Sequence, residues 1–358
     1  MYKQILITGG AGFVGSSLAI HLKTRHPSLE ITALDNLHRR GSELNLPRLK
    51  SAGVKFEHGD IRCPPDLRFS KTAPELIIEC SAEPSAQAGY GGSPEFLIQT
   101  NLNGCYHCLE LARETRADFI FISTSRVYPV QRLNDLSFHE TDSRFALSEQ
   151  QAVPGASAEG VSEKFPLEGA RSLYGMTKLA GELMVTEYAD AYGIRAIVNR
   201  CGLIAGPWQM GKTDQGVISL WVAAHHFKQS LKYIGFGGSG KQVRDILHID
   251  DLCDLIDDQI QNPDQYSGRL FNAGGGLAGS LSLREMTALC QRITGSTIPI
   301  VSSAEDRPAD IRIFLTDHRR LTAYREWRPR RGPETVLNDI YEWIRREERF
   351  LQPILAPA

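Results

Sequence analysis

A tyrosine and a lysine stand four residues apart in a stretch that is predicted to be helical. Tyr174 and Lys178 occupy positions i and i+4 of a helix predicted over residues 173–191, so the two side chains share one face. The pKa of a tyrosine is normally about 10, but an adjacent ammonium stabilises the phenolate and lowers that value. Such a pair is suited to proton transfer when a carbonyl is made or broken. Tyrosine–lysine pairs with this spacing are also common on exposed helix surfaces, so the pair indicates catalysis only if the chain also contains a dinucleotide motif.

Two hydroxyl side chains follow a short apolar stretch upstream of this helix. Residues 118–123 predict a buried strand, and Thr124 and Ser125 come directly after it. A hydroxyl at the carboxyl end of a strand can hydrogen-bond a reacting oxygen, or it can satisfy backbone groups at the strand end.

A glycine-rich turn connects the first predicted strand to the first predicted helix. The letters TGGAGFVG span residues 8–15 and include Gly9, Gly12 and Gly15. We expect Gly9 to permit a tight turn, Gly12 to let a pyrophosphate lie against bare backbone, and Gly15 to let helix and strand pack closely. The helix N-terminus offers N–H groups and a positive dipole end to that phosphate. Glycine trios occur in ordinary turns too, but this position favours a dinucleotide site.

An acidic residue ends the second predicted strand, which covers residues 29–34. Asp35 and Asn36 follow this strand, about twenty residues beyond the last glycine of the turn. A carboxylate there can accept hydrogen bonds from both ribose hydroxyls of an adenosine and repels a 2′-phosphate, so Asp35 favours NAD over NADP. The alternative is a solvated aspartate at a strand end. Arg40 either lines the adenosine phosphate or is an exposed loop charge.

Strands and helices alternate through the first part of the chain. Further strands are predicted over residues 54–58, 75–80, 118–123 and 195–200, and a helix over residues 94–113. The alternation predicts an α/β fold with a Rossmann-type, doubly wound parallel sheet, whose ligands bind at the carboxyl ends of the strands.

The second part of the chain has a looser pattern. Strands are predicted over residues 231–234 and 242–249, and helices over residues 250–261, 282–294 and 333–346. We therefore predict a Rossmann domain over residues 1–205 and a smaller C-terminal α/β substrate lobe over residues 206–358, interleaved with it. Residues 134–166 are polar and irregular, which predicts a lid or a poorly ordered insert.

Composition and charge exclude several classes of protein. The chain has 358 residues, of which 42% are hydrophobic and 23% charged, with a net charge of -2. This balance is globular, and a nucleic-acid partner would require a basic excess. No apolar run approaches about 18 residues, so we expect no membrane span. Seven scattered cysteines indicate the reduced thiols of a cytoplasmic protein, and Cys105 and Cys108 form a CxxC inside a predicted helix that we do not assign to a metal.

Taken in order, these motifs resemble the extended short-chain dehydrogenases/reductases, the family of nucleotide-sugar epimerases and dehydratases. The resemblance rests on TGGAGFVG, Asp35-Asn36, the Gly59-Asp60-Ile61 stretch, STSRVY at residues 123–128, and the Tyr174–Lys178 pair. It implies bound NAD, a nucleoside-diphosphate sugar as substrate, a homodimer or homotetramer, and Thr124, Tyr174 and Lys178 as catalytic residues. The cofactor-binding residues that it implies are Gly9, Gly12, Phe13, Val14, Asp35, Asn36, Arg40, Asp60, Ile61, Ser81, Ala82, Asn101, Tyr174, Lys178 and Cys201.

Three longer stretches narrow the resemblance. They are DNLHRRGSELN at residues 35–45, GPWQMGKTDQG at 206–216 and GSGKQVRDILH at 238–248. They are similar to family members that invert carbon 2 of a CDP-hexose such as CDP-paratose, CDP-tyvelose or a CDP-glucose-like sugar. The substrate-binding residues that this implies are Thr124, Ser125, Gln209, Gln215, Arg244 and Arg307. A guanidinium fork suits a diphosphate, although either arginine could be an ordinary surface ion-pair partner.

The resemblance implies a reaction in which bound NAD is retained. The Tyr174 phenolate takes the proton of the 2-hydroxyl, hydride leaves carbon 2, and a transient 2-keto sugar presents its other face before hydride returns. The alternatives are an epimerase for another carbon or a UDP-sugar, and a non-catalytic NAD-binding regulator. A 4,6-dehydratase is disfavoured because Ser125 and Arg126 stand where such relatives have Asp-Glu. Residues Glu79–Pro84 stand where many relatives have a His-Leu-Ala-Ala-Gln-like stretch. This difference leaves the identity of the sugar substrate undecided.

Overall fold

The computed structural model describes residues 2–68, 72–211 and 216–356. The chain divides into two compact units, and it passes from one to the other several times. The first unit comprises Met1–Thr124, Leu173–Arg200 and Leu252–Leu270. The second unit comprises Ser125–Ser172, Cys201–Asp251 and Phe271–Ala358.

A seven-stranded sheet forms the centre of the first unit, in the order β14-β10-β5-β4-β1-β2-β3. The strands are β1 (Gln4–Thr8), β2 (Glu30–Asp35), β3 (Lys55–His58), β4 (Leu76–Glu79), β5 (Asp118–Thr124), β10 (Ala196–Cys201) and β14 (Arg269–Ala273). The pairings that connect β3, β2, β1, β4 and β5 are all parallel. Every residue of β4, β5 and β10 is buried, because helices cover both faces of a parallel sheet.

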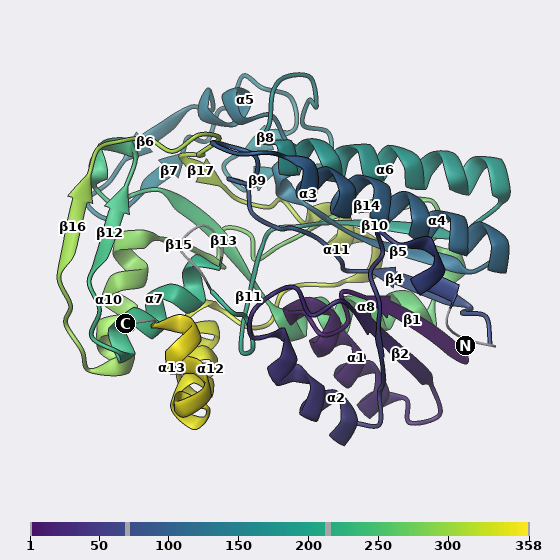
Figure 1. The fold of residues 1–358 in the computed structure, drawn as a ribbon. Coiled ribbons are helices and arrows are strands. Elements are labelled where there is room, and N and C mark those ends of the chain that lie inside the picture. Colours follow the sequence, from purple (N-terminus) through teal and green to yellow (C-terminus); the bar gives the residue numbers. More distant parts are fainter. Residues whose placement is uncertain (1, 69–71, 212–215, 357–358) are drawn as a thin grey trace. The chain divides into compact units, whose positions relative to one another are not determined.

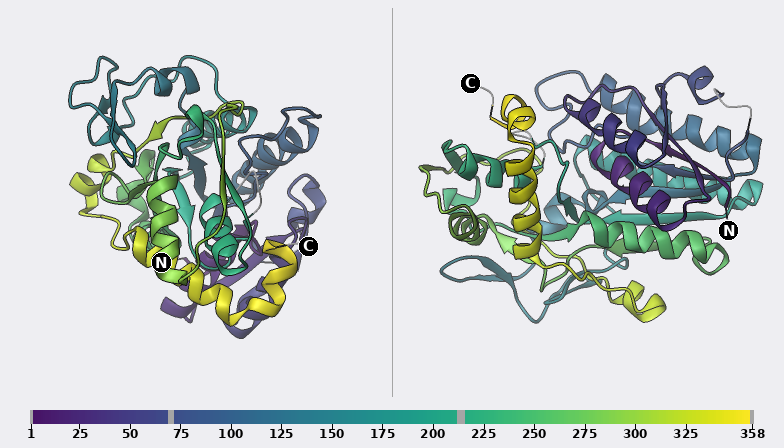
Figure 2. Two further views of the ribbon diagram at one scale, coloured as in Figure 1. Left: turned by 90° about the vertical axis from the view of Figure 1, so that its left-hand side faces the viewer. Right: turned by 90° about the horizontal axis from the view of Figure 1, so that it is seen from below.

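Helices lie on both faces of this sheet (Figure 1). One face carries α1 (Phe13–Arg25), α2 (Leu46–Ser51) and α8 (Ile249–Gln261), and the view from below in Figure 2 looks onto them. The other face carries α3 (Glu95–Ile98), α4 (Gly104–Thr115) and α6 (Leu173–Tyr192), while α9 (Pro263–Tyr266) precedes β14. Short 3-10 turns occur at η1 (Ser42–Asn45) and η2 (Pro64–Arg68). The predicted doubly wound parallel sheet is therefore confirmed.

The helix predicted over residues 94–113 is present, but it is not uniform. Between α3 and α4 the backbone forms a π-helical segment, η3 (Gln99–Asn103), and the helix continues to Thr115. Strand β14 was not predicted, because its five residues, RLFNA, are too few to show a period.

The second unit contains shorter strands. Its four-stranded sheet consists of β11 (Leu203–Ala205), β13 (Val243–His248), β15 (Ser280–Ser282) and β17 (Ile313–Phe314), and β12 (Leu231–Ile234) pairs in parallel with β16 (Ile300–Ser303). Its helices are α5 (Val130–Asn134), α7 (Val217–His226), α10 (Leu283–Thr294), α11 (Arg319–Arg325), α12 (Pro333–Arg346) and α13 (Glu348–Leu355), with 3-10 turns η4 (Ser125–Val127) and η5 (Phe236–Gly238). Helix α10 begins where predicted because Ser282 and Glu285 form a capping box.

The predicted insert at residues 134–166 folds into two small hairpins. They are β6 (Phe138–Glu140) with β7 (Phe145–Leu147), and β8 (Ala156–Ser157) with β9 (Gly160–Val161). The backbone N–H of Phe145 donates to Lys241, and that of Val161 donates to Leu315. These bonds attach the insert to the body of the second unit, so of the two alternatives the poorly ordered insert was wrong, and the lid stays a prediction.

Two further expectations bear on the class of protein. No helix among the described residues is long and apolar enough to cross a membrane. The thiols of Cys105 and Cys108 are buried in α4, and burial raises the pKa of both. A buried thiol that resists ionisation is a poor metal ligand and a poor redox nucleophile.

Candidate active site

The glycine-rich turn is shaped by close backbone contacts. Gly9 has a φ of +64°, and a Cβ placed on it would lie 2.8 Å from the backbone of Cys80. A Cβ on Gly15 would lie 2.2 Å from the carbonyl oxygen of Gly9. A Cβ on Gly12 would meet only Gly9, at 3.1 Å, so the outer side of the turn is bare backbone. Helix α1 begins there, with Phe13 and Val14 in its first turn.

Gly10 adds a contact that the sequence analysis did not single out. A Cβ on Gly10 would lie 2.6 Å from Ala33 of β2, and the Gly10 N–H donates to the carbonyl of Leu34. The turn is therefore pressed against β2 as well as against the end of β4.

The acidic group at the end of β2 is bound to the same turn. One oxygen of Asp35 accepts the N–H of Ala11 at 3.1 Å, and the other accepts that of Leu37 at 2.8 Å. Burial raises the pKa of Asp35, and these two N–H donors oppose that rise. The side chain thus fixes the glycine turn from the place where a ribose hydroxyl would approach.

A second acidic group follows β3. Asp60 accepts hydrogen bonds from Asn36 and from the Arg62 guanidinium. Burial raises the pKa of Asp60, but the bonds from Arg62 and Asn36 outweigh it and lower the pKa to about 2. Ile61 is buried against Gly104, and Arg40 is exposed in the loop after β2.

Asn101 holds the loop after β4 to helix α6. Its Oδ1 accepts the N–H of Glu83 at 2.8 Å, and its Nδ2 donates to the Glu83 carbonyl at 3.1 Å and to Thr177 Oγ1 at 3.2 Å. Asn101 is only 2% exposed. The loop that it holds contains the predicted cofactor residues Ser81 and Ala82.

The predicted catalytic pair lies on the buried face of α6. Tyr174 and Lys178 are 9% and 3% exposed, and Thr124, at the end of β5, is 8% exposed. Helix α6 packs directly on β5, so the sheet end that carries Thr124 and the helix that carries the pair belong to one unit. The exposed-pair alternative for Tyr174 and Lys178 is excluded by their burial.

The Lys178 ammonium is bound by two groups inside the first unit. Its Nζ donates to a carboxylate oxygen of Glu79 at 3.3 Å and lies 4.3 Å from the ring centroid of Phe121. Burial lowers the pKa of Lys178, but the neighbouring acidic groups, Glu79 foremost, together outweigh it and raise the pKa. Sequence analysis had treated Glu79 only as a departure from relatives. The signal that could have identified it is the carboxylate that ends the buried run LIIE, residues 76–79.

The predicted diphosphate ligands belong to the second unit. Arg244 on β13 donates to Asp310 at 3.1 Å, and burial lowers the pKa of Arg244 while Asp310 opposes that change. Arg307 lies three residues before Asp310 in the loop between β16 and β17. The two predicted arginines are thus part of the same unit, and one of them is already held in place by a carboxylate.

The remaining predicted residues are less open to a ligand. Gln209 is 6% exposed; its Nε2 donates to Ile204, and its Oε1 accepts the hydroxyl of Ser219. Cys201 is buried in the second unit, where Ser125 begins η4. Gln215 lies outside the described residues.

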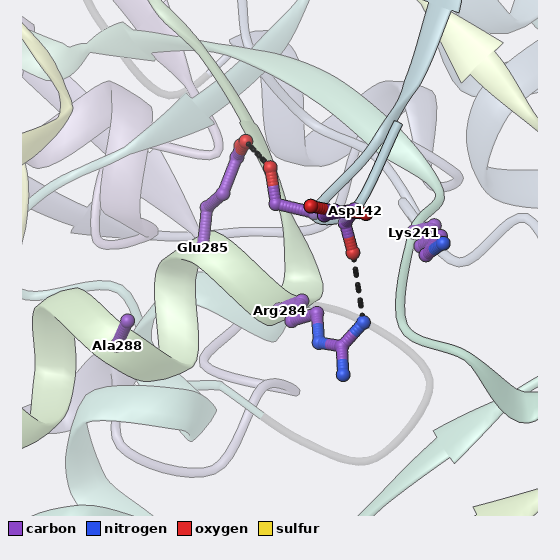
Figure 3. Close-up of a pocket in the computed structure, with 6 residues that line it drawn as sticks. Asp142, Lys241, Arg284, Glu285 and Ala288 are labelled. Atoms are coloured by element: carbon purple, nitrogen blue, oxygen red, sulfur yellow. Dashed lines mark hydrogen bonds between the residues drawn. The ribbon is translucent and has the colours of Figure 1, made fainter. Parts of the chain in front are cut away.

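A pocket of about 530 Å³ opens in the second unit beside α10 (Figure 3). Several of its polar groups are already paired: Arg284 donates to the carbonyl of Asp142, Ser143 donates to Glu285, and Lys241 pairs with Glu140, which does not line the pocket. None of the predicted site residues lines this pocket.

The first unit fits a dinucleotide cofactor. Its glycine turn leaves bare backbone at the start of α1, where the N–H groups and helix dipole favour a pyrophosphate. The last residue of β2 is the acidic Asp35 rather than a basic residue, which suits an unphosphorylated ribose.

Comparisons with known proteins agree with this arrangement. A family model described as "NAD dependent epimerase/dehydratase family" matches residues 5–274. The chain is 28% identical to CDP-paratose 2-epimerase of Salmonella typhi, over 95% of this chain and 98% of that protein. It is 25% identical to dTDP-glucose 4,6-dehydratase of Streptomyces antibioticus, over 98% of this chain and 95% of that protein.

The fold is also similar to solved structures. The UDP-glucuronic acid 4-epimerase of Bacillus cereus, solved with UDP-glucuronic acid and NAD, superposes with a TM-score of 0.78 at 21% identity. The match covers 96% of this chain and 99% of that one. Because the family model spans most of the chain, the chain belongs to the NAD dependent epimerase/dehydratase family: it is an NAD-dependent enzyme of the nucleotide-sugar epimerase and dehydratase type.

Proposed function

We propose that the chain is an NAD-dependent epimerase that inverts carbon 2 of a CDP-hexose. The observation that carries the proposal is the buried Tyr174–Lys178 pair on α6, in the same unit as the glycine turn and Asp35. The choice of CDP and of carbon 2 is supported by the likeness to CDP-paratose 2-epimerase and by the GKQVRD stretch that contains Arg244.

In this proposal each residue of the first unit has one task. Tyr174, as a phenolate, removes the proton of the 2-hydroxyl and later returns it. Lys178 stabilises the phenolate and would hold the nicotinamide ribose, and Thr124 donates a hydrogen bond to the reacting oxygen. When bound, NAD would supply reversible hydride transfer at carbon 2, without net oxidation of the sugar. Gly9, Gly12 and their neighbours would hold the cofactor at the sheet end.

The substrate diphosphate is assigned to the arginines of the second unit. Arg244 is partly buried and fixed by Asp310, so its guanidinium is oriented before a ligand binds. Arg307 supplies a second charge. Ser125 and Arg126 lack the carboxylates that a 4,6-dehydratase uses to eliminate water, which weighs against that reaction although named dehydratases are among the relatives.

The deciding experiment is a comparison of sugars. The purified protein is incubated separately with CDP-paratose, CDP-glucose and UDP-glucose, and NMR follows inversion at each ring carbon. We expect inversion at carbon 2 of a CDP-sugar, with no accumulation of free NADH.

A Tyr174→Phe variant is the matched control, because it removes one oxygen from a buried ring. We expect its kcat to fall by about 10²- to 10⁴-fold. Inversion only at carbon 4, or only with the UDP-sugar, would contradict the specific proposal and leave the family intact. A Tyr174→Phe protein of full activity would contradict the assigned base.

We further propose a homodimer formed through α4 and α6. These helices expose large apolar side chains at Tyr106, Leu183 and Tyr192, which are 44%, 62% and 55% exposed. Light scattering after gel filtration should give twice the chain mass, and Leu183→Glu should give the single-chain mass. A wild-type chain that is monomeric at every concentration would contradict this proposal. The cytoplasmic location stays a prediction.

A further inference from the structure

The Glu79–Lys178 ion pair is buried where the proposed chemistry takes place. Both side chains are almost fully buried, at 2% and 3% exposed, and the two residues are 99 positions apart in the chain. Glu79 is the last residue of β4, paired in the sheet with Thr8 of β1 on one side and Phe121 of β5 on the other. Its backbone position is therefore fixed from both sides.

A buried ion pair is a poor way to gain stability. Removing two charges from water costs about as much as their attraction returns, and two well-packed apolar side chains would serve as well. A lone ammonium at this depth, however, loses its proton readily, since burial disfavours the charged form. The pair therefore points to a requirement for charge on Lys178.

We propose that Glu79 is a positioning residue: its carboxylate is the counter-ion that keeps the buried Lys178 ammonium protonated and holds it beside Tyr174. The proposal rests on the assignment of Lys178 to the proton-transfer pair. Burial raises the pKa of Glu79, and two neighbours oppose that rise: the Lys178 ammonium and the Ser81 backbone N–H, which donates to the same carboxylate.

Other titratable groups near Lys178 do not replace Glu79. They are Tyr174 on α6 and Cys105 on α4, and their charges act on Lys178 less strongly than that of Glu79. Cys108, also on α4, lies near Glu79, and burial raises the pKa of both thiols, so they stay neutral at physiological pH.

The test is the pH dependence of unfolding by urea, without substrate. In Glu79→Gln we expect the folded-state pKa of Lys178 to fall below its unfolded value of about 10.4. Between these two pKa values the unfolded chain binds more protons than the folded chain, so stability rises with pH in this range. The unfolding equilibrium constant should fall by up to about tenfold per pH unit there. In the wild type the pKa of Lys178 is raised, so the contribution of Lys178 to stability is constant below the unfolded value of about 10.4 and is lost above it.

The chain contains a matched control. Glu182 on α6 is 4% exposed and pairs with Arg200 at 2.7 Å, so it too is a buried glutamate in an ion pair. An arginine does not deprotonate, so Glu182→Gln should lose stability equally at every pH. A Glu79→Gln variant whose loss of stability is equally independent of pH would overturn the proposal.

A third variant keeps the test valid if Glu79→Gln does not fold. Burial raises the pKa of Glu79 already in the wild type, and Lys178 opposes that rise. In Lys178→Met the opposition is lost, so stability should fall with rising pH over a wider range above the unfolded value of about 4.3 than it does in the wild type. The double variant Glu79→Gln, Lys178→Met should lack this additional fall. If the fall in Lys178→Met equals that of the wild type, the two groups do not compensate each other and the proposal fails.

The activity profile separates this proposal from the proposed function. With an accepted sugar, Glu79→Gln should lose kcat on the alkaline side at a lower pH than the wild type does, because Lys178 loses its proton earlier. An unchanged alkaline limb would overturn the proposal. If no sugar reacts, the proposed function fails, and the unfolding series still decides the role of Glu79.

Discussion

Replacing Gly15 by alanine tests how the glycine turn is built. A Cβ there would lie 2.2 Å from the Gly9 carbonyl oxygen and 2.8 Å from the Gly10 Cα, which are backbone atoms that cannot rotate away. Overpacking of this kind costs up to about 3 kcal/mol, while alanine in place of glycine inside a helix returns about 1 kcal/mol. We expect Gly15→Ala to lower the free energy of unfolding by about 2 kcal/mol.

Gly12→Ala is the matched control in the same turn. Gly12 has a φ of -70° and a ψ of 175°, which alanine adopts freely, and its Cβ would meet only the Gly9 backbone, with the carbonyl oxygen at 3.1 Å. We expect a change in stability below about 1 kcal/mol but at least a tenfold loss of NAD affinity, because the methyl group occupies the phosphate side.

The two effects are measured separately. Urea denaturation without NAD gives the change in stability, and calorimetric titration of cofactor-free protein with NAD gives the change in affinity. The reasoning is refuted if Gly15→Ala is as stable as the wild type, or if Gly12→Ala is the less stable of the two. Full NAD affinity in Gly12→Ala would refute the assignment of the bare backbone to the pyrophosphate.

Three further predictions concern side chains of the first unit. Asp35→Ala should weaken NAD binding about a hundredfold and reduce discrimination against NADP, measured by titration with both; equal loss for both would contradict the ribose assignment. Asn101→Ala removes three hydrogen bonds of a buried side chain and should lower the free energy of unfolding by about 3 kcal/mol in urea denaturation; a loss below about 1 kcal/mol would contradict the role of Asn101 in holding the loop after β4 to α6. Arg62 and Asn36 lower the pKa of Asp60 to about 2. The ionised Asp60 side chain therefore stabilises the fold above about pH 4, and this stabilisation is lost as pH falls. Relative to Asp60→Asn, the wild type should therefore lose about 1 kcal/mol between about pH 5 and pH 2, after allowance for solvent screening, and parallel curves would contradict this.

Local patterns predicted the elements that carry the site. The strand-turn-helix around Gly9 and the helix that begins at Leu173 follow from residue types a few positions apart, and both are present. The capping box at Ser282 is a local signal of the same kind.

Contacts between distant segments could not be predicted in this way. Glu79 and Lys178 are 99 residues apart, and Asn101 and Thr177 are 76 apart, so neither pair leaves a periodic pattern in the sequence. Strand β14 is defined by its neighbours in the sheet rather than by its own five residues. The hairpins of the insert at residues 134–166 likewise depend on partners elsewhere in the second unit.

The π-helical segment at Gln99–Asn103 makes the length of its helix a constraint. A π segment inserts one extra residue into a helix, which rotates everything after it by about 100° relative to a uniform α-helix. Asn101 and the buried face of α4, which includes Cys105 and Leu109, both depend on that offset. Deleting one residue here would restore a regular helix and turn either Asn101 or the buried face of α4 toward solvent. This segment should therefore tolerate changes of residue type better than changes of length.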